Sequence, residues 1–247
     1  MRSLILKFRY DDIWRDILAL WTQHRAIAIP LIGVFSFLPA FAQLLFIPAP
    51  KIEALDWDGV NLAMAYYEAN VVPLMAIRMA SLLGTAALIY IMLARDSGSV
   101  GEALMRALVM LPSLFLLSII LSFAVTTGLF ALIVPGLYLL ARLLLSEPAM
   151  ILDKSYNPFD AMAKSLAMTA GQGWRICGIF CVFVLGVWIV VQAIAILATF
   201  VGKLLLPVAG MDMLAAALGA VSASAFALVI ALLTAVLYRR LSTNSGT

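Results

Sequence analysis

The sequence predicts an all-α, polytopic membrane protein with six transmembrane helices and two interfacial amphipathic helices. Hydrophobic residues make up 65% of the chain and charged residues 12%, against about 25% charged in a typical soluble domain. A helix needs roughly 20 apolar residues to cross the hydrocarbon core of a bilayer. Five long stretches contain no charged side chain: Ala26–Pro50, Met79–Ala94, Ala107–Ala141, Ile176–Gly202 and Met213–Tyr238. The third stretch is long enough for two crossings.

The six expected spans cover about 26–47, 73–94, 107–126, 129–145, 176–199 and 214–238. Only short loops remain between them, so residues 1–247 form a single integral membrane domain. The charged segment 48–70 is the main expected external loop. Thr127 and Gly128 form a short turn that makes spans three and four an antiparallel hairpin.

The distribution of positive charge predicts the orientation. Most of the 16 Lys and Arg residues fall on one side of the predicted spans, and Lys51 and Lys203 fall on the other. Short cytoplasmic loops are enriched in Lys and Arg. We therefore expect a multi-pass protein of the bacterial inner membrane with both termini in the cytoplasm. This rule accounts for the excess of basic over acidic residues, so no nucleic-acid partner is expected.

Two segments have the pattern of helices that lie on a membrane surface. The first is in the cytoplasmic segment 1–25, where Asp11–Thr22 places Trp14 and Trp21 on one apolar edge. The N-terminus lacks the apolar core and cleavage site of a signal peptide, so we expect it to be retained. The second starts at Asn157-Pro158 and runs to about Ala170. Asn suits the N-cap and Pro the first helical position.

The sixth span carries small residues at every fourth position, which favours close helix packing. These residues are Ala215, Gly219, Ala223, Ala227, Ala231 and Ala235. They predict a packing face inside the bundle, with a homo-oligomer interface as the alternative. In span four, Pro135-Gly136 predicts a mid-span kink, because proline removes a backbone donor.

Polar side chains inside the spans are the candidate site residues, because such residues are costly in hydrocarbon and are therefore usually functional. They are Arg78, Arg142, Glu147 and Gln192. Each arginine lies close enough to an interface to extend to the lipid headgroups. The alternative is that one or both face the bundle interior and bind an anionic headgroup or a carboxylate. Glu147 and Glu102 are the candidate partners of Arg142, and Glu68 is that of Arg78. We expect Gln192 to form an interhelical hydrogen bond.

Enzymatic signals are nearly absent. The chain has one histidine, His24, beside a predicted span, and no hydrolase, P-loop or zinc-binding motif. Cys177 and Cys181 lie in the fifth span and are expected to pack as small apolar residues. We therefore expect no catalytic residues, no cofactor and no metal site.

A family resemblance rests on Val134–Arg175. The matching positions are Pro135-Gly136, Tyr138, Arg142, Pro148, Asp153, Ala161, Ser165, Thr169, Gly171 and Arg175. This segment resembles the membrane domain of glycerophosphoryl diester phosphodiesterases and of the related YciC-like proteins. The resemblance implies a six-helix integral membrane module, mostly without an assigned activity. Phosphodiesterase members carry catalysis in a separate soluble domain, so the resemblance does not imply that activity for this chain.

Three functional classes remain. The first is a non-catalytic module that binds membrane lipids, anionic ones among them, or a membrane partner, and that supports envelope homeostasis. The second is a transporter, a channel or a lipid-translocating protein. It requires Arg78 or Arg142 to face a cavity accessible to water or lipid. The third, the least favoured, is an enzyme that modifies lipids, which requires acidic residues clustered around Arg142 or His24.

Overall fold

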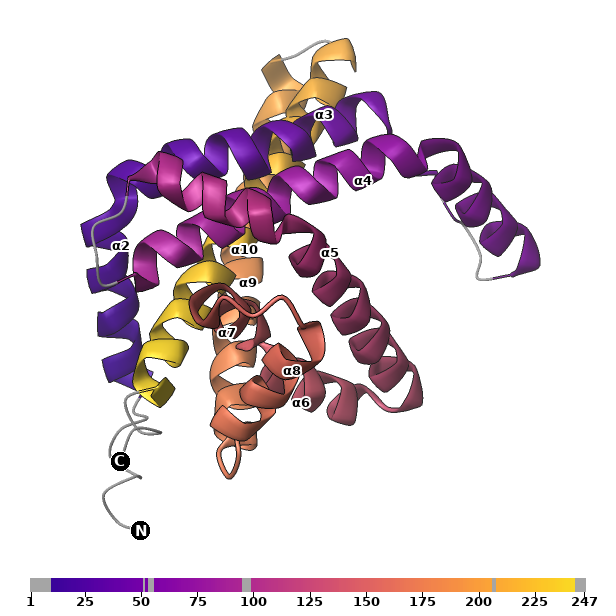
Figure 1. The fold of residues 1–247 in the computed structure, drawn as a ribbon. Coiled ribbons are helices and arrows are strands. Elements are labelled where there is room, and N and C mark those ends of the chain that lie inside the picture. Colours follow the sequence, from indigo (N-terminus) through magenta and orange to yellow (C-terminus); the bar gives the residue numbers. More distant parts are fainter. Residues whose placement is uncertain (1–9, 51, 53–55, 95–98, 206–207, 243–247) are drawn as a thin grey trace.

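The computed structural model describes residues 10–50, 52, 56–94, 99–205 and 208–242. Every regular element in this part of the chain is a helix (Figure 1). Six segments are long and apolar enough to cross a membrane: Asp11–Phe46, Trp57–Leu93, Val100–Phe130, Ile133–Asp153, Gly173–Leu204 and Gly210–Ser242. The structure thus confirms the predicted fold class, an all-α protein with six candidate spans.

The first span is a continuous helical run rather than a surface helix followed by a span. It consists of α2 (Tyr10–Ile32), a π-helical turn η1 (Gly33–Phe37) and α3 (Leu38–Phe46). The predicted interfacial segment belongs to α2, and its Ile13, Ile17 and Leu20 side chains are buried in the protein core. Its apolar face therefore packs against other helices, and the structure does not confirm a separate interfacial helix there.

The second span starts much earlier than expected. Helix α4 (Trp57–Leu93) includes most of the segment predicted to be an external loop. Asp56 caps it by accepting a hydrogen bond from the Gly59 backbone N–H at 2.8 Å. The helix bends at Asn70, whose φ of −118° and ψ of 15° are not helical, and Pro73 follows within one turn. In Figure 1 the segment before this bend turns away from the rest of the bundle.

The fourth span is interrupted, but not where Pro135-Gly136 predicted. Helix α5 (Val100–Ala131) ends at extended Leu132, and α6 (Ile133–Leu143) starts directly after it. Pro135 therefore lies in the first turn of α6, where a missing N–H costs no helical hydrogen bond. A Cβ at Gly136 would lie 2.5 Å from the Leu129 backbone nitrogen, so this glycine permits the tight α5–α6 turn. The predicted mid-span kink is wrong. The fourth span is instead interrupted between α6 and α7 (Ser146–Asp153).

Helix α8 (Pro158–Met168) forms as its capping residues predicted. The Asn157 side chain accepts a hydrogen bond from the Phe159 backbone N–H at 3.1 Å. Gly171 follows the helix with a φ of +73°, a conformation that favours glycine. Ala161 and Ser165 are buried against the protein. The helix is confirmed, while its contact with a membrane surface stays a prediction.

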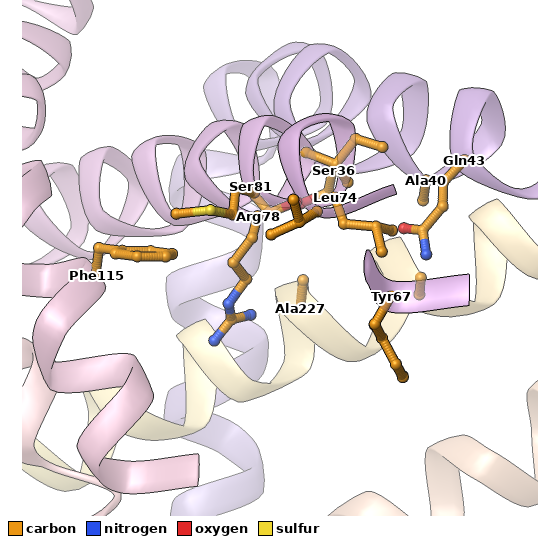
Figure 2. Close-up of a pocket in the computed structure, with 13 residues that line it drawn as sticks. Ser36, Ala40, Gln43, Tyr67, Leu74, Arg78, Ser81, Phe115 and Ala227 are labelled. Atoms are coloured by element: carbon orange, nitrogen blue, oxygen red, sulfur yellow. The ribbon is translucent and has the colours of Figure 1, made fainter. Parts of the chain in front are cut away.

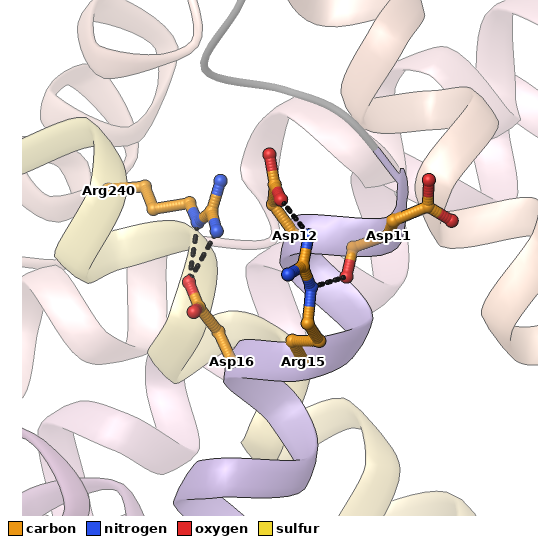
Figure 3. Close-up of polar contacts among 5 residues, drawn as sticks. All are labelled: Asp11, Asp12, Arg15, Asp16 and Arg240. Atoms are coloured by element: carbon orange, nitrogen blue, oxygen red, sulfur yellow. Dashed lines mark hydrogen bonds and ion pairs between the residues drawn. The ribbon is translucent and has the colours of Figure 1, made fainter.

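The last two spans are α9 (Gly173–Leu205) and α10 (Val208–Ser242). The end of α10 lies beside the start of α2, where the Arg240 Nε donates to Asp16 at 2.7 Å (Figure 3). Arg239 also donates to the Met92 carbonyl at the end of α4. The described ends of the first and last spans therefore share one side of the bundle, as an even number of crossings requires.

The core is concentrated at this same side. The largest fully buried apolar side chains are Ile13, Leu88, Ile89, Met92, Leu117, Leu145, Met150, Ile176, Ile179, Leu233 and Leu237. Toward the other side, α5 diverges from the α9–α10 pair (Figure 1), and Phe130 and Leu204 are largely exposed. The bundle is thus closed at one side and open at the other. Cys177 is buried, Cys181 is half-buried, and both are free thiols.

Candidate functional site

Arg78 lines a cavity with a volume of about 580 Å³. The cavity lies between η1, α3, α4, α5 and α10. Figure 2 shows the Arg78 side chain leaving α4 and extending toward α10 near Ala227, while Gln43 of α3 lines another part of the same cavity. Ser36, in the π-helical turn, and Ser81 add hydroxyl groups to the wall. The site therefore combines one positive charge with several uncharged polar groups.

The Arg78 guanidinium makes no hydrogen bond or ion pair within the described part of the chain. Glu68, its candidate partner from the sequence, does not pair with it. Arg78 lies eight residues beyond the Asn70 bend and fifteen before Leu93, or about 12 Å and about 22 Å along a helix. The charge is thus placed well inside the span, at the edge of a cavity, with its donors available to a ligand.

A second polar cavity, of about 440 Å³, adjoins the first. It is lined by Gln192 and Thr199 of α9 and by Ser222 of α10. The two cavities share Ala40, Gln43 and Ala223 as wall residues. We call them together the polar crevice. Gln192 is exposed in this crevice, and the interhelical hydrogen bond predicted for it is not formed within the described residues.

The small-residue face of α10 divides between packing and cavity wall. Ala231 and Ala235 are buried in the core, where close packing was predicted. Ala223 and Ala227 line the Arg78 cavity, and Ala215 and Gly219 line its neighbour. The small side chains over this half of α10 thus border the cavities, and Gly219 also lets the Leu44 side chain of α3 approach α10 closely. The homo-oligomer alternative stays a prediction.

Glu147 lies in a separate cavity of about 250 Å³ between α5, α6, α7 and α10. Its carboxylate forms no ion pair among the described residues, but it lies within electrostatic range of Arg78. Neither candidate partner is paired with Arg142, because Glu102 binds Arg106 at 2.9 Å. The structure therefore associates Glu147 with Arg78, which is 69 positions earlier in the chain.

Arg142 faces helix α8 rather than a cavity. Its Nε donates to the Thr169 hydroxyl at 3.2 Å, and its terminal nitrogen donates to the Leu166 carbonyl. In the other direction, the Ser165 hydroxyl donates to the Arg142 carbonyl at 2.6 Å. The guanidinium also lies 5.9 Å from the centre of the Tyr138 ring. These contacts hold the last turn of α8 against α6, and they engage both the Nε and one terminal nitrogen of Arg142 with the protein itself.

Sequence reasoning missed Gln43, the residue that the two cavities share. The available signal was an amide side chain inside a charge-free stretch, the same signal that singled out Gln192. The π-helical turn that brings Ser36 to the cavity has no comparable signal in the sequence. Such turns often occur at functional sites.

The described residues contain no group of three or more acidic, His or Cys side chains arranged to hold a metal ion. No family model, curated protein or solved structure matches this chain. The geometry of the crevice is therefore the feature of this protein that points to a function.

Proposed function

We propose that this protein is a non-catalytic membrane module that binds an anionic lipid headgroup at Arg78, in the bacterial inner membrane with both termini cytoplasmic. The observation that carries the proposal is an unpaired guanidinium in a cavity of about 580 Å³ within a transmembrane bundle. Arginine presents a planar fork of donors that matches the oxygens of a phosphate. A guanidinium that makes no hydrogen bond to the described part of the protein leaves that fork free for a ligand.

The open side of the bundle supports a lipid as the ligand. The helices diverge there, and the exposed apolar side chains of Val71 and Met75 line the Arg78 cavity, so acyl chains have apolar surface to contact beside the crevice. The predicted topology puts this side toward the outer leaflet, because the start of α2 and the basic end of α10, which are both expected to be cytoplasmic, lie at the closed side. A headgroup would enter the crevice while its chains stay in the bilayer.

The test is lipid mass spectrometry on protein purified from bacterial membranes in a mild detergent. Wild type is compared with Arg78→Ala and Arg78→Lys, and with Arg175→Ala as the matched control. Arg175 is exposed and makes no ion pair in the described structure. A charge-assisted hydrogen bond is worth about 1.5–3 kcal/mol, so Arg78→Ala should weaken binding of the enriched lipid about tenfold to hundredfold.

The proposal predicts that wild type and Arg175→Ala retain acidic lipids above their share of the membrane, and that Arg78→Ala does not. Arg78→Lys should retain part of the effect, because lysine keeps the charge but loses the bidentate fork. Retained lipids that mirror the membrane in every variant would rule the proposal out.

Translocation of the same lipids is the second candidate function, and Glu147 favours it. A carboxylate in its own cavity, within electrostatic range of Arg78, is typical of sites that exchange ions or protons. The test is flipping of fluorescent acidic lipids in proteoliposomes of wild type and Glu147→Gln. Flipping that exceeds that of protein-free vesicles and is lost in the variant would favour translocation over binding alone.

A further inference from the structure

We infer that the polar crevice selects acidic phospholipids with a hydroxylated, amine-free headgroup, such as phosphatidylglycerol. This inference rests on the proposed function and specifies its ligand. The phosphate would lie at Arg78, and the hydroxyl groups of the headgroup would lie along Gln43 and Gln192.

The chemistry of the two linings carries the inference. The Arg78 cavity supplies the positive charge, and the adjoining cavity supplies only uncharged polar groups, among them Gln192, Thr199 and Ser222. Amides and hydroxyls both donate and accept hydrogen bonds. They match the alcohols of a polyol, which also do both. A site that bound only a phosphate would not need these additional hydrogen-bonding side chains.

The absence of acidic side chains argues against an amine-bearing headgroup. Neither lining includes an aspartate or a glutamate among the described residues. An ammonium group placed next to Gln192 would lose water without gaining a carboxylate partner, which is costly in a membrane interior. Ethanolamine and serine headgroups are therefore disfavoured.

The two cavities have wall residues in common, and the inference places one headgroup across both. Gln43 and Ala223 line both cavities, so the two cavities adjoin at these residues. The Gln43 amide makes no hydrogen bond within the described part of the chain. In the inferred pose the headgroup extends from its phosphate at Arg78 toward Gln43, and Gln192 lines the adjoining cavity.

The test titrates purified protein in detergent with short-chain lipids and measures bound lipid by native mass spectrometry. The probes are dioctanoyl phosphatidylglycerol, phosphatidylmethanol and phosphatidylethanolamine. The first two carry the same charge and differ only in the hydroxylated headgroup. The variants are Gln192→Leu and Gln192→Glu, with Gln23→Leu as the matched control, since Gln23 is exposed on α2 outside both linings.

We expect wild type and Gln23→Leu to bind phosphatidylglycerol about tenfold more tightly than phosphatidylmethanol, as one or two net hydrogen bonds imply. In Gln192→Leu this ratio should fall toward one while binding of both lipids still depends on Arg78. In Gln192→Glu the new carboxylate should raise the affinity for phosphatidylethanolamine.

Three failures are distinguishable. Equal affinity for phosphatidylglycerol and phosphatidylmethanol in wild type, with both lost in Arg78→Ala, would overturn the headgroup inference and leave the proposed function standing. Binding of all probes that is indifferent to Arg78→Ala would overturn the proposed function itself, and the inference with it. A phosphatidylglycerol preference that survives Gln192→Leu would show that the crevice does not contact the hydroxyl groups as inferred.

Discussion

Replacing Arg142 with alanine should destabilise the protein without changing its lipid selectivity. The guanidinium donates to the Thr169 hydroxyl at 3.2 Å and to the Leu166 carbonyl, and both acceptors belong to the end of α8. The Arg142 side chain thus links α8 to α6 through hydrogen bonds. The sequence alone made Arg142, like Arg78, a candidate ligand of a lipid headgroup. This variant therefore distinguishes a structural role of Arg142 from a role in lipid binding.

The expected magnitude follows from what the variant leaves unpaired. The Thr169 hydroxyl still donates to the Ser165 carbonyl at 2.8 Å and lies 3.3 Å from the Leu166 carbonyl. Neither acceptor is therefore fully orphaned. The net loss should equal about one charge-assisted hydrogen bond, or about 2–3 kcal/mol. For a chain of this size, that corresponds to a fall in Tm of about 4–12 °C.

The assay is thermal denaturation in one detergent, followed by the loss of the monodisperse peak in size-exclusion chromatography after heating. Arg175→Ala is the control, because it removes an exposed arginine near the same end of the bundle. The Ser165 bond to the Arg142 backbone carbonyl remains in the variant, so α8 should still dock and the protein should still fold. Lipid mass spectrometry on the same samples should give the wild-type profile.

Two results would refute this reasoning. The first is a Tm for Arg142→Ala that is indistinguishable from that of Arg175→Ala. The second is the loss of acidic-lipid enrichment in Arg142→Ala, which would make Arg142 a headgroup ligand after all.

Three further predictions concern the packing and the closed side of the bundle. Gly136→Ala should lower the free energy of unfolding by about 1–3 kcal/mol, because the new Cβ would lie too close to rigid backbone. Gly186→Ala is the control: no atom lies within 4 Å of its new Cβ, so its Tm should be unchanged or higher. Asp16→Asn breaks the partly exposed pair with Arg240 and should cost less than about 1 kcal/mol, with an effect on Tm that shrinks as salt is added. Burial lowers the pKa of Lys164, but the hydrogen bond to the carboxylate at the end of α7 and the nearby tyrosine outweigh burial and raise it above its ordinary value of 10.5. The stabilisation that the charged Lys164 side chain gives to the folded state is therefore complete below pH 10.5 and is lost as the pH rises through the raised pKa. A Lys164→Gln variant lacks this contribution, so its Tm should fall less than that of wild type between neutral and strongly alkaline pH.

The sequence predicted the features that depend on local chemistry. Transfer of a helix into hydrocarbon depends on its own composition, so charge-free stretches identified the six spans without knowledge of their neighbours. The start of α8 was equally local, because Asn157 caps the helix with its own side chain. The extent of α4 was missed, since charged and polar residues in segment 48–70 form a helix that hydropathy treats as a loop.

Only the tertiary structure decided which polar residues face open space. Arg78 and Arg142 look alike in the sequence, yet Arg142 is engaged by α8 while Arg78 lines a cavity. The difference arises because the direction of a side chain in a bundle depends on helices distant in the chain, and a one-dimensional pattern does not record it. The same holds for Gln43, which joins two cavities built by α3, α4, α9 and α10. The chain's composition thus determined that its helices suit a membrane, and the packing of those helices determined which polar side chains line a cavity.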